Sequence, residues 1–166
     1  MKVYLSKVEG KTAVETDVST FINSDVPEMT KIIVEKYSKL KALIIQENQN
    51  YKQDKKLSHF HNIGSAIIDF GANMGTNDLT VRNLVIFLSK DTGLSDNTLN
   101  YMRRFAERFK LSSISDKYSW AFYRELVDIQ DEKVRKHVEK EAMRTGACSN
   151  HKSVRQIKKE IMNAKE

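Results

Sequence analysis

Residues 85–104 read VIFLSKDTGLSDNTLNYMRR and are the most informative segment of the chain. It predicts a helix, a three-residue turn and a second helix, the spacing of a helix-turn-helix. Gly93 stands where the first helix would end in a left-handed residue, a conformation that costs glycine little. Ser95 follows the turn, and its hydroxyl can accept a hydrogen bond from an early backbone N–H of the second helix. We therefore expect two helices that meet at a sharp turn.

The second helix of this pair separates apolar from polar side chains. The apolar residues of the motif would face each other and the core: Leu88, Leu94, Leu99 and Met102. The opposite stripe, at intervals of three and four residues, carries amide, phenol and guanidinium groups: Asn97, Asn100, Tyr101, Arg104 and Arg108. These groups can bond to base edges and phosphates, which favours DNA binding. The alternative is an ordinary helical hairpin, because any hairpin with the same caps shares most of these features.

Length and composition set the broad class of protein. A chain of 166 residues, with 40% hydrophobic and 30% charged residues, is long enough for one folded domain or for two small helical ones. No apolar run approaches the length of a membrane span. The amino-terminal residues are too polar for a signal peptide, and the one cysteine, Cys148, fits a reducing cytosol.

The distribution of arginine indicates where binding occurs. The formal charge is +6 and the isoelectric point is about 9.3, which favours a nucleic acid partner. All eight arginines lie at or after Arg82, whereas the first half of the chain carries lysines that acidic residues largely balance. Because guanidinium groups bind phosphate and guanine in a fixed geometry, we expect the binding surface in the second half.

The first part of the chain predicts a short arm and a long helix. Residues 2–15 alternate weakly between apolar and polar, so we expect a short β-hairpin or an arm there. From residue 27 to about 47, apolar residues recur every 3.5 residues and predict a helix: Ile33, Tyr37, Leu40 and Ile44. This stripe either covers the chain's own core or forms the seam of a homodimer. Residues 48–56 would be a polar linker or a frayed helix end.

Further helices are predicted over residues 57–70, 119–129 and 131–145, and from Ser153 onward; Gly64 would allow a close helix approach. The chain is therefore expected to be all-α, a multi-helix domain that contains the helix-turn-helix. We divide it into residues 1–56, the arm and a long helix for dimerisation, and residues 57–166, the DNA-binding domain. Basic residues of the last helix could contact phosphate, although a solvated face is the alternative: Lys152, Arg155, Lys158 and Lys159.

The pattern from about residue 60 to 161 resembles two families of DNA-binding domain. Residues 88–95 (LSKDTGLS), the charged segment 132–146 that ends in glycine, and residues 153–157 (SVRQI) resemble the central helix-turn-helix domain of ParB-like partition proteins. Residues 62–64 (NIG), 99–105 (LNYMRRF) and 119–120 (SW) are similar to the N-terminal domain of YhcG-like nucleases. The resemblance implies a DNA-binding domain. The sequence lacks the arginine-rich nucleotide-binding motif of ParB proteins and the nuclease half of the second family, so it implies neither a CTP-driven clamp nor catalysis.

The sequence contains no set of side chains at the spacing typical of a catalytic site or a metal site. His59 and His61 point two ways on a helix, and neither cysteine nor acid stands at ligand spacing beside them. Asp131 and Glu132 are better explained as the cap and first turn of a helix. Residues 71–75 lack the ending of a phosphate-binding loop. We therefore expect no enzymatic activity, no metal and no cofactor.

The sequence predicts a sequence-selective double-stranded DNA-binding protein, either a ParB-like partition (centromere-binding) protein or a transcriptional regulator. The helix that follows Ser95 would lie in the major groove, with Asn97, Asn100 and Tyr101 reading bases and Arg103, Arg104 and Arg108 holding the backbone or guanine. Ser95 itself is a further predicted DNA contact. Expected partners are DNA, a second copy of the chain, and a partition ATPase or another protein, in the cytoplasm at the nucleoid and away from membranes. The alternatives are a helical protein-interaction adaptor and the DNA-specificity module of a nuclease complex.

Overall fold

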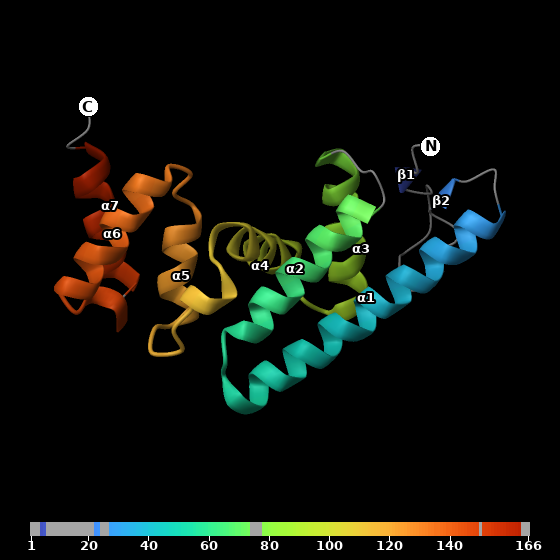
Figure 1. Cartoon of the computed structure of the whole chain (residues 1–166), viewed down its shortest axis with the longest axis horizontal. Helices are drawn as coiled ribbons and strands as arrows, with labels where there is room; N and C mark the ends of the chain where they lie inside the picture. Colours follow the sequence, from blue (N-terminus) through green and yellow to red (C-terminus); the bar gives the residue numbers. More distant parts are fainter. Residues whose placement is uncertain (1–3, 6–21, 24–26, 74–77, 150, 164–166) are drawn as a thin grey trace. The chain divides into compact units, whose positions relative to one another are not determined.

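The computed structural model of this chain describes residues 4–5, 22–23, 27–73, 78–149 and 151–163. These residues contain seven α-helices, two short 3₁₀ helices and two strands of two residues each. The expected all-α class is confirmed. None of these helices combines the length and the hydrophobicity needed to cross a membrane. The chain forms two compact units, residues 1–107 (unit 1) and residues 108–166 (unit 2) (Figure 1).

Unit 1 is built on a pair of antiparallel helices. Helix α1 (Pro27–Asp54) and helix α2 (Ser58–Asn73) run side by side and are joined by a short turn (Figure 1). The predicted α1 stripe is at most 5% exposed: Ile33, Tyr37, Leu40 and Ile44. The chain's own core therefore covers this stripe, and a homodimer would need another surface. The sequence-based division at residue 56 falls inside unit 1, between two helices that pack against each other.

Helix α1 continues past its predicted end at Glu47. The ring of Tyr51 packs on that of Phe60 in α2, with 3.9 Å between the ring centroids, and this contact gives the last turns of α1 an apolar partner. Gln46 Nε2 also donates to Asn50 Oδ1 at 2.9 Å. The helix ends at Asp54, and the next residue, Lys55, has a left-handed φ of 60° that turns the chain towards α2. Residues 48–54 are therefore helix rather than linker.

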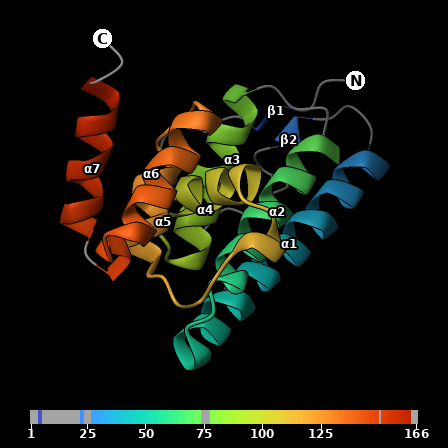
Figure 2. The ribbon, with the colours of Figure 1, turned by 60° about the vertical axis from the view of Figure 1, so that its left-hand side comes forward.

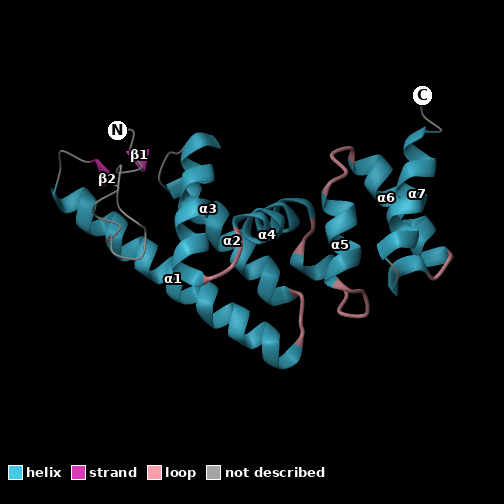
Figure 3. Ribbon diagram, turned by 180° about the vertical axis from the view of Figure 1, so that it is seen from behind, coloured by secondary structure: helices cyan, strands magenta, loops and turns pink. Residues whose placement is uncertain are grey.

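The predicted helix-turn-helix is formed by α3 (Asp78–Thr92), the turn 93–95 and α4 (Asp96–Arg108); Figure 3 distinguishes helices from loops. Gly93 has the expected left-handed φ of 73°, and its N–H donates to the Ser89 carbonyl at 3.0 Å. Ser95 Oγ accepts a hydrogen bond from the Thr98 N–H at 3.1 Å, which caps α4. Of the residues expected to face the core, Leu88, Leu99 and Met102 are buried and Leu94 is partly buried.

Helix α4 passes very close to α2 at Gly64. A Cβ atom on Gly64 would lie 2.1 Å from the Met102 carbonyl oxygen and 2.9 Å from the Ala106 Cβ, both far inside van der Waals contact. The backbones therefore approach so closely that glycine alone fits without a shift. The rings of His61 and Phe105 meet edge to face with centroids 6.0 Å apart, beside this approach. These contacts fix which face of α4 is turned away from the core.

Unit 2 contains α5 (Trp120–Val127), α6 (Glu132–Arg144) and α7 (His151–Asn163), together with the 3₁₀ helices η2 (Leu111–Ser113) and η3 (Ala147–Ser149) (Figure 2). Its core is made by Phe122, Tyr123, Leu126, Val138, Ala142 and Val154. Asp131 caps α6 as predicted, because its carboxylate accepts from the N–H groups of Lys133 and Val134. The prediction that Ser153 begins the last helix was wrong, because α7 already begins at His151.

The N-terminal strands β1 (Tyr4–Leu5) and β2 (Ile22–Asn23) pair antiparallel, with Tyr4 opposite Asn23 and Leu5 opposite Ile22. The sequence predicted a hairpin or an arm within residues 2–15. The pairing partner of β1 lies later in the chain, and residues 6–21 fall outside the described part of the structure.

Candidate nucleic-acid interface

Helix α4 is buried on one face and exposed on the other. Its apolar residues are at most 1% exposed: Leu99, Met102 and Phe105. On the opposite side, Asn97 is exposed, and three further side chains are partly exposed: Asn100, Tyr101 and Arg104. Unit 1 therefore presents two amides, a phenol and a guanidinium on one accessible helix face.

Tyr101 and Arg104 form a stacked pair on this face. The guanidinium carbon of Arg104 lies 4.5 Å from the centroid of the Tyr101 ring, one helical turn away. A guanidinium over an aromatic face is held by the quadrupole of the ring. Because the long arginine side chain is already oriented, a ligand bound there would cost less side-chain entropy.

The start of α4 is already occupied by protein groups. Ser95 is exposed, but its hydroxyl caps the helix and also forms a hydrogen bond with Thr98 Oγ1 at 2.8 Å. Asp96 lies in the first turn, and its carboxylate accepts from the Asn97 N–H at 2.8 Å. A carboxylate at this position repels phosphate, so the helix terminus itself is a poor anion site.

Arg103 is engaged with a neighbour on its own helix. Its Nη1 lies 2.7 Å from Glu107 Oε1, an i,i+4 ion pair, and its buried Nε has no hydrogen-bond partner among the described residues. A phosphate at Arg103 would have to compete with the Glu107 carboxylate. Exposed ion pairs contribute little stability, so this exchange is inexpensive.

Arg108 ends α4 and belongs to unit 2. Its Nη1 donates to the Ile129 carbonyl at 3.4 Å, an oxygen that also accepts from Nη1 of the buried Arg135 at 3.1 Å. The predicted stripe is therefore split between the two units. Helical spacing placed Arg108 on the outward stripe, but it did not reveal this backbone acceptor.

The predicted phosphate contacts of α7 are partly paired within unit 2. Arg155 Nη2 lies 2.6 Å from Glu125 Oε1, and Lys158 Nζ lies 3.5 Å from the Glu125 carbonyl oxygen. Lys159 is exposed, and the side chain of Lys152 falls outside the described residues. Glu125 therefore reduces the positive charge that this patch can offer.

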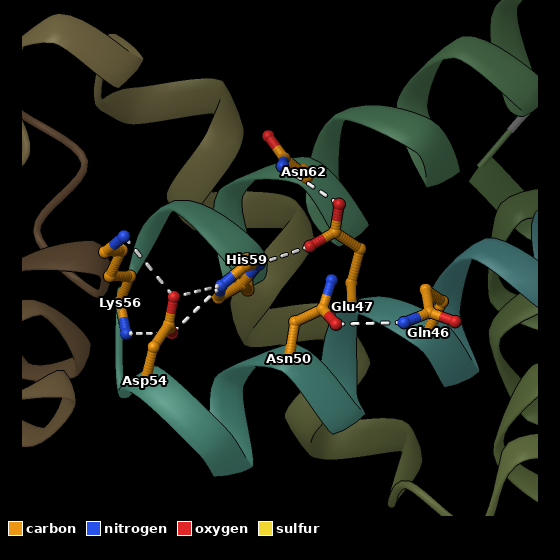
Figure 4. A network of polar contacts seen from close by, with 7 residues as sticks. All are labelled: Gln46, Glu47, Asn50, Asp54, Lys56, His59 and Asn62. Atoms are coloured by element: carbon orange, nitrogen blue, oxygen red, sulfur yellow. Dashed lines mark hydrogen bonds and ion pairs between the residues drawn. The ribbon is translucent and has the colours of Figure 1, made fainter.

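His59 lies in a network of carboxylates at the junction of α1 and α2 (Figure 4). Its Nδ1 is 2.5 Å from Glu47 Oε2 and its Nε2 is 3.0 Å from Asp54 Oδ1. Burial lowers the pKa of His59, but the hydrogen bonds and charges of Glu47 and Asp54 outweigh it, so the pKa lies above its ordinary value. Asn62 also donates to Glu47, at 3.1 Å. The residues that the structure describes contain no group of three or more acidic, histidine or cysteine side chains suited to a metal ion.

A hydrogen bond between distant residues fixes the end of α3. The buried Tyr37 hydroxyl donates to Asp91 Oδ2 at 3.0 Å, and Lys41 Nζ lies 3.6 Å from the same oxygen. Burial, followed by the negative charge of Asp91, raises the pKa of Tyr37, so the hydroxyl stays protonated and donates. Asp91 lies two residues before Gly93, and α1 thereby holds the segment that leads into the turn. Sequence reasoning missed this link because nothing local relates residues so far apart.

No family model matches the sequence, and neither the curated proteins nor the solved structures contain a match.

Proposed function

We propose that this protein binds double-stranded DNA sequence-selectively, with α4 in the major groove. The observation that carries the proposal is the exposed face of α4, where Asn97 and Asn100 stand beside the stacked Tyr101–Arg104 pair while the opposite face is fixed in the core. A helix that follows a tight turn and projects such groups is the reading element of helix-turn-helix proteins.

Each side chain on this face has a distinct chemical use. An asparagine amide can pair in a bidentate manner with adenine, and a guanidinium with guanine. Asn97 and Asn100 would therefore read bases, and Arg104 would bind guanine or an adjacent phosphate. Arg103 would contact phosphate by exchanging its Glu107 partner.

The biological role that we propose follows the resemblance to ParB-like domains: partition of a DNA locus or control of its transcription, at the nucleoid and without catalysis. A second copy of the chain and a partition ATPase are the proposed protein partners. Dimers that read two half-sites are common among helix-turn-helix proteins.

The experiment is a selection of bound sequences from a random duplex library, followed by affinity measurements with an α4 variant. Asn100→Ala, Arg104→Ala should lose about 1–3 kcal/mol per lost base contact on the selected site and bind random duplex nearly as the parent does. The matched control is Lys36→Ala, Gln49→Ala, which removes one cation and one amide from exposed positions of α1.

Two outcomes contradict the proposal: a library that yields no preferred sequence, or a folded α4 variant that binds selected and random DNA as the parent does. The protein-interaction adaptor would then take its place.

One observation favours that second function, namely the exposure of large apolar residues on α1: Ile32, Leu43 and Ile45. An adaptor should bind duplex poorly at any salt concentration, whereas phosphate contacts give a steep loss of affinity with salt.

A further inference from the structure

The charge of this protein is distributed very unevenly between its two units. Unit 2 holds 14 of the 28 Lys and Arg residues but only 9 of the 22 Asp and Glu residues, so it carries +5 of the total formal charge of +6. Unit 1, which contains the exposed face of α4, has a formal charge of only +1. The electrostatic attraction of the chain for a polyanion therefore resides mainly in unit 2.

One face of α6 concentrates this charge. Five basic or imidazole side chains recur there at intervals of three and four residues, and all of them are exposed: Lys133, Lys136, His137, Lys140 and Arg144. We call these five residues the α6 basic face. The opposite side of the helix is buried in the core of unit 2 through Val134, Val138 and Ala142. The α6 basic face is thus held rigidly towards solvent.

Acidic neighbours leave much of this charge available. Lys136 pairs with Glu132 and Arg144 with Glu141, both within the helix, and the two cations remain more than 70% exposed. Such exposed pairs are weak and yield readily to a stronger anion. Lys133 and Lys140 take part in none of the ion pairs found among the described residues.

We propose that the α6 basic face binds the phosphodiester backbone of double-stranded DNA, as a second contact surface distinct from α4. From residue 133 to residue 144 the helix rises about 16 Å, which matches roughly five phosphates of one strand. Three of the four permanent cations are lysines, which act as point charges and suit phosphate rather than base edges. The face carries no amide side chain, so the contact is independent of sequence.

The geometry disfavours an anionic membrane as the partner. A helix that lies on a membrane buries an exposed apolar face in the lipid. The apolar side of α6 is already buried in unit 2, and one exposed methionine, Met143, borders the basic face. A surface of cations with so little apolar area fits the regularly charged backbone of DNA better than it fits a membrane.

The test uses the full chain and a short duplex of random sequence. Lys133→Gln, Lys140→Gln removes two exposed charges that take part in none of the ion pairs among the described residues, and circular dichroism establishes that the variant is folded. If both lysines meet phosphate, the slope of log affinity against log salt becomes shallower by about 1.8. The ratio of variant to parent Kd is then about 12 times larger at about 50 mM salt than at about 200 mM.

The matched control is Lys36→Gln, Lys52→Gln, which removes the same net charge from exposed positions of α1 that also take part in none of the ion pairs found among the described residues. It should keep the parent slope. Equal salt slopes for the parent and the α6 variant overturn the proposal. An equal change of slope in the control variant also overturns it, because the effect would then depend on net charge and not on the α6 basic face. If the α6 variant loses binding to phosphatidylserine vesicles but binds DNA as the parent does, the partner is a membrane and the proposal is overturned.

This test is separate from that of the proposed function. Binding of random duplex by the α6 variant decides the role of the α6 basic face, whereas discrimination between selected and random DNA by the α4 variant decides the role of α4. If Lys133→Gln, Lys140→Gln lowers the salt slope but the library yields no preferred sequence, the role of the α6 basic face stands and the proposed role of α4 falls.

Discussion

Replacing Gly64 by alanine should force α2 and α4 apart. The new Cβ would lie 2.1 Å from the Met102 carbonyl oxygen and 2.6 Å from its carbon. Helix α4 would have to move by more than about 1 Å to restore ordinary contact, and no rotamer change helps because both atoms are backbone. Overpacking of this kind costs about 1–3 kcal/mol, whereas the better helix propensity of alanine returns at most about 1 kcal/mol. Because the two nearest atoms are backbone, we expect the upper end of this cost and a net loss of about 2 kcal/mol in the free energy of unfolding.

Urea denaturation followed by far-ultraviolet circular dichroism measures this loss. Ser65→Ala is the matched control, since it changes the next residue of α2 and adds no atom near α4. Among the described residues, Ser65 makes only a local hydrogen bond with His61, at 3.4 Å, so this control should stay within about 0.5 kcal/mol of the parent. A Gly64→Ala variant as stable as the parent would refute the close approach of the two backbones.

Two further predictions concern the polar contacts of α1. His59→Gln removes the imidazolium held by Glu47 and Asp54. The folded-state pKa of His59 is raised above 6.5, so its contribution to stability, about 1 kcal/mol, is complete below pH 6.5. That contribution is lost as the pH rises through the folded-state pKa. The difference in unfolding free energy between parent and variant should therefore shrink with rising pH, and a difference that grows would contradict the network. Tyr37→Phe should cost about 1 kcal/mol by removing the donor to Asp91, and much less in an Asp91→Ala background, which has no acceptor for the hydroxyl. Strictly additive losses in urea denaturation would mean that the hydrogen bond contributes nothing.

The helix-turn-helix could be predicted because its determinants are local. Gly93 and Ser95 act on backbone groups within four residues of themselves, and Asp131 caps α6 in the same way. The apolar spacing of α1 likewise predicted its buried face, although the sequence left open whether the partner was the chain's own core or a second copy.

Contacts between distant residues could not be predicted in this way. The bond from Tyr37 to Asp91 and the stacking of Tyr51 on Phe60 depend on how helices pack, which spacing within one helix does not specify. Arg108 and Arg155 illustrate a second limit. Helical periodicity fixes the direction of a Cβ atom, but a long side chain can reach a partner off its own stripe, here the Ile129 carbonyl and Glu125.

The formal charge of +1 on unit 1 bears on how quickly such a protein would find its site. Long-range attraction accelerates diffusional encounter, and unit 2 supplies nearly all of it. A DNA-binding protein with this division would associate at a rate set by unit 2 and by ionic strength, whereas contacts between α4 and bases would act on the rate of dissociation. Selected and random duplexes should then differ in residence time far more than in association rate.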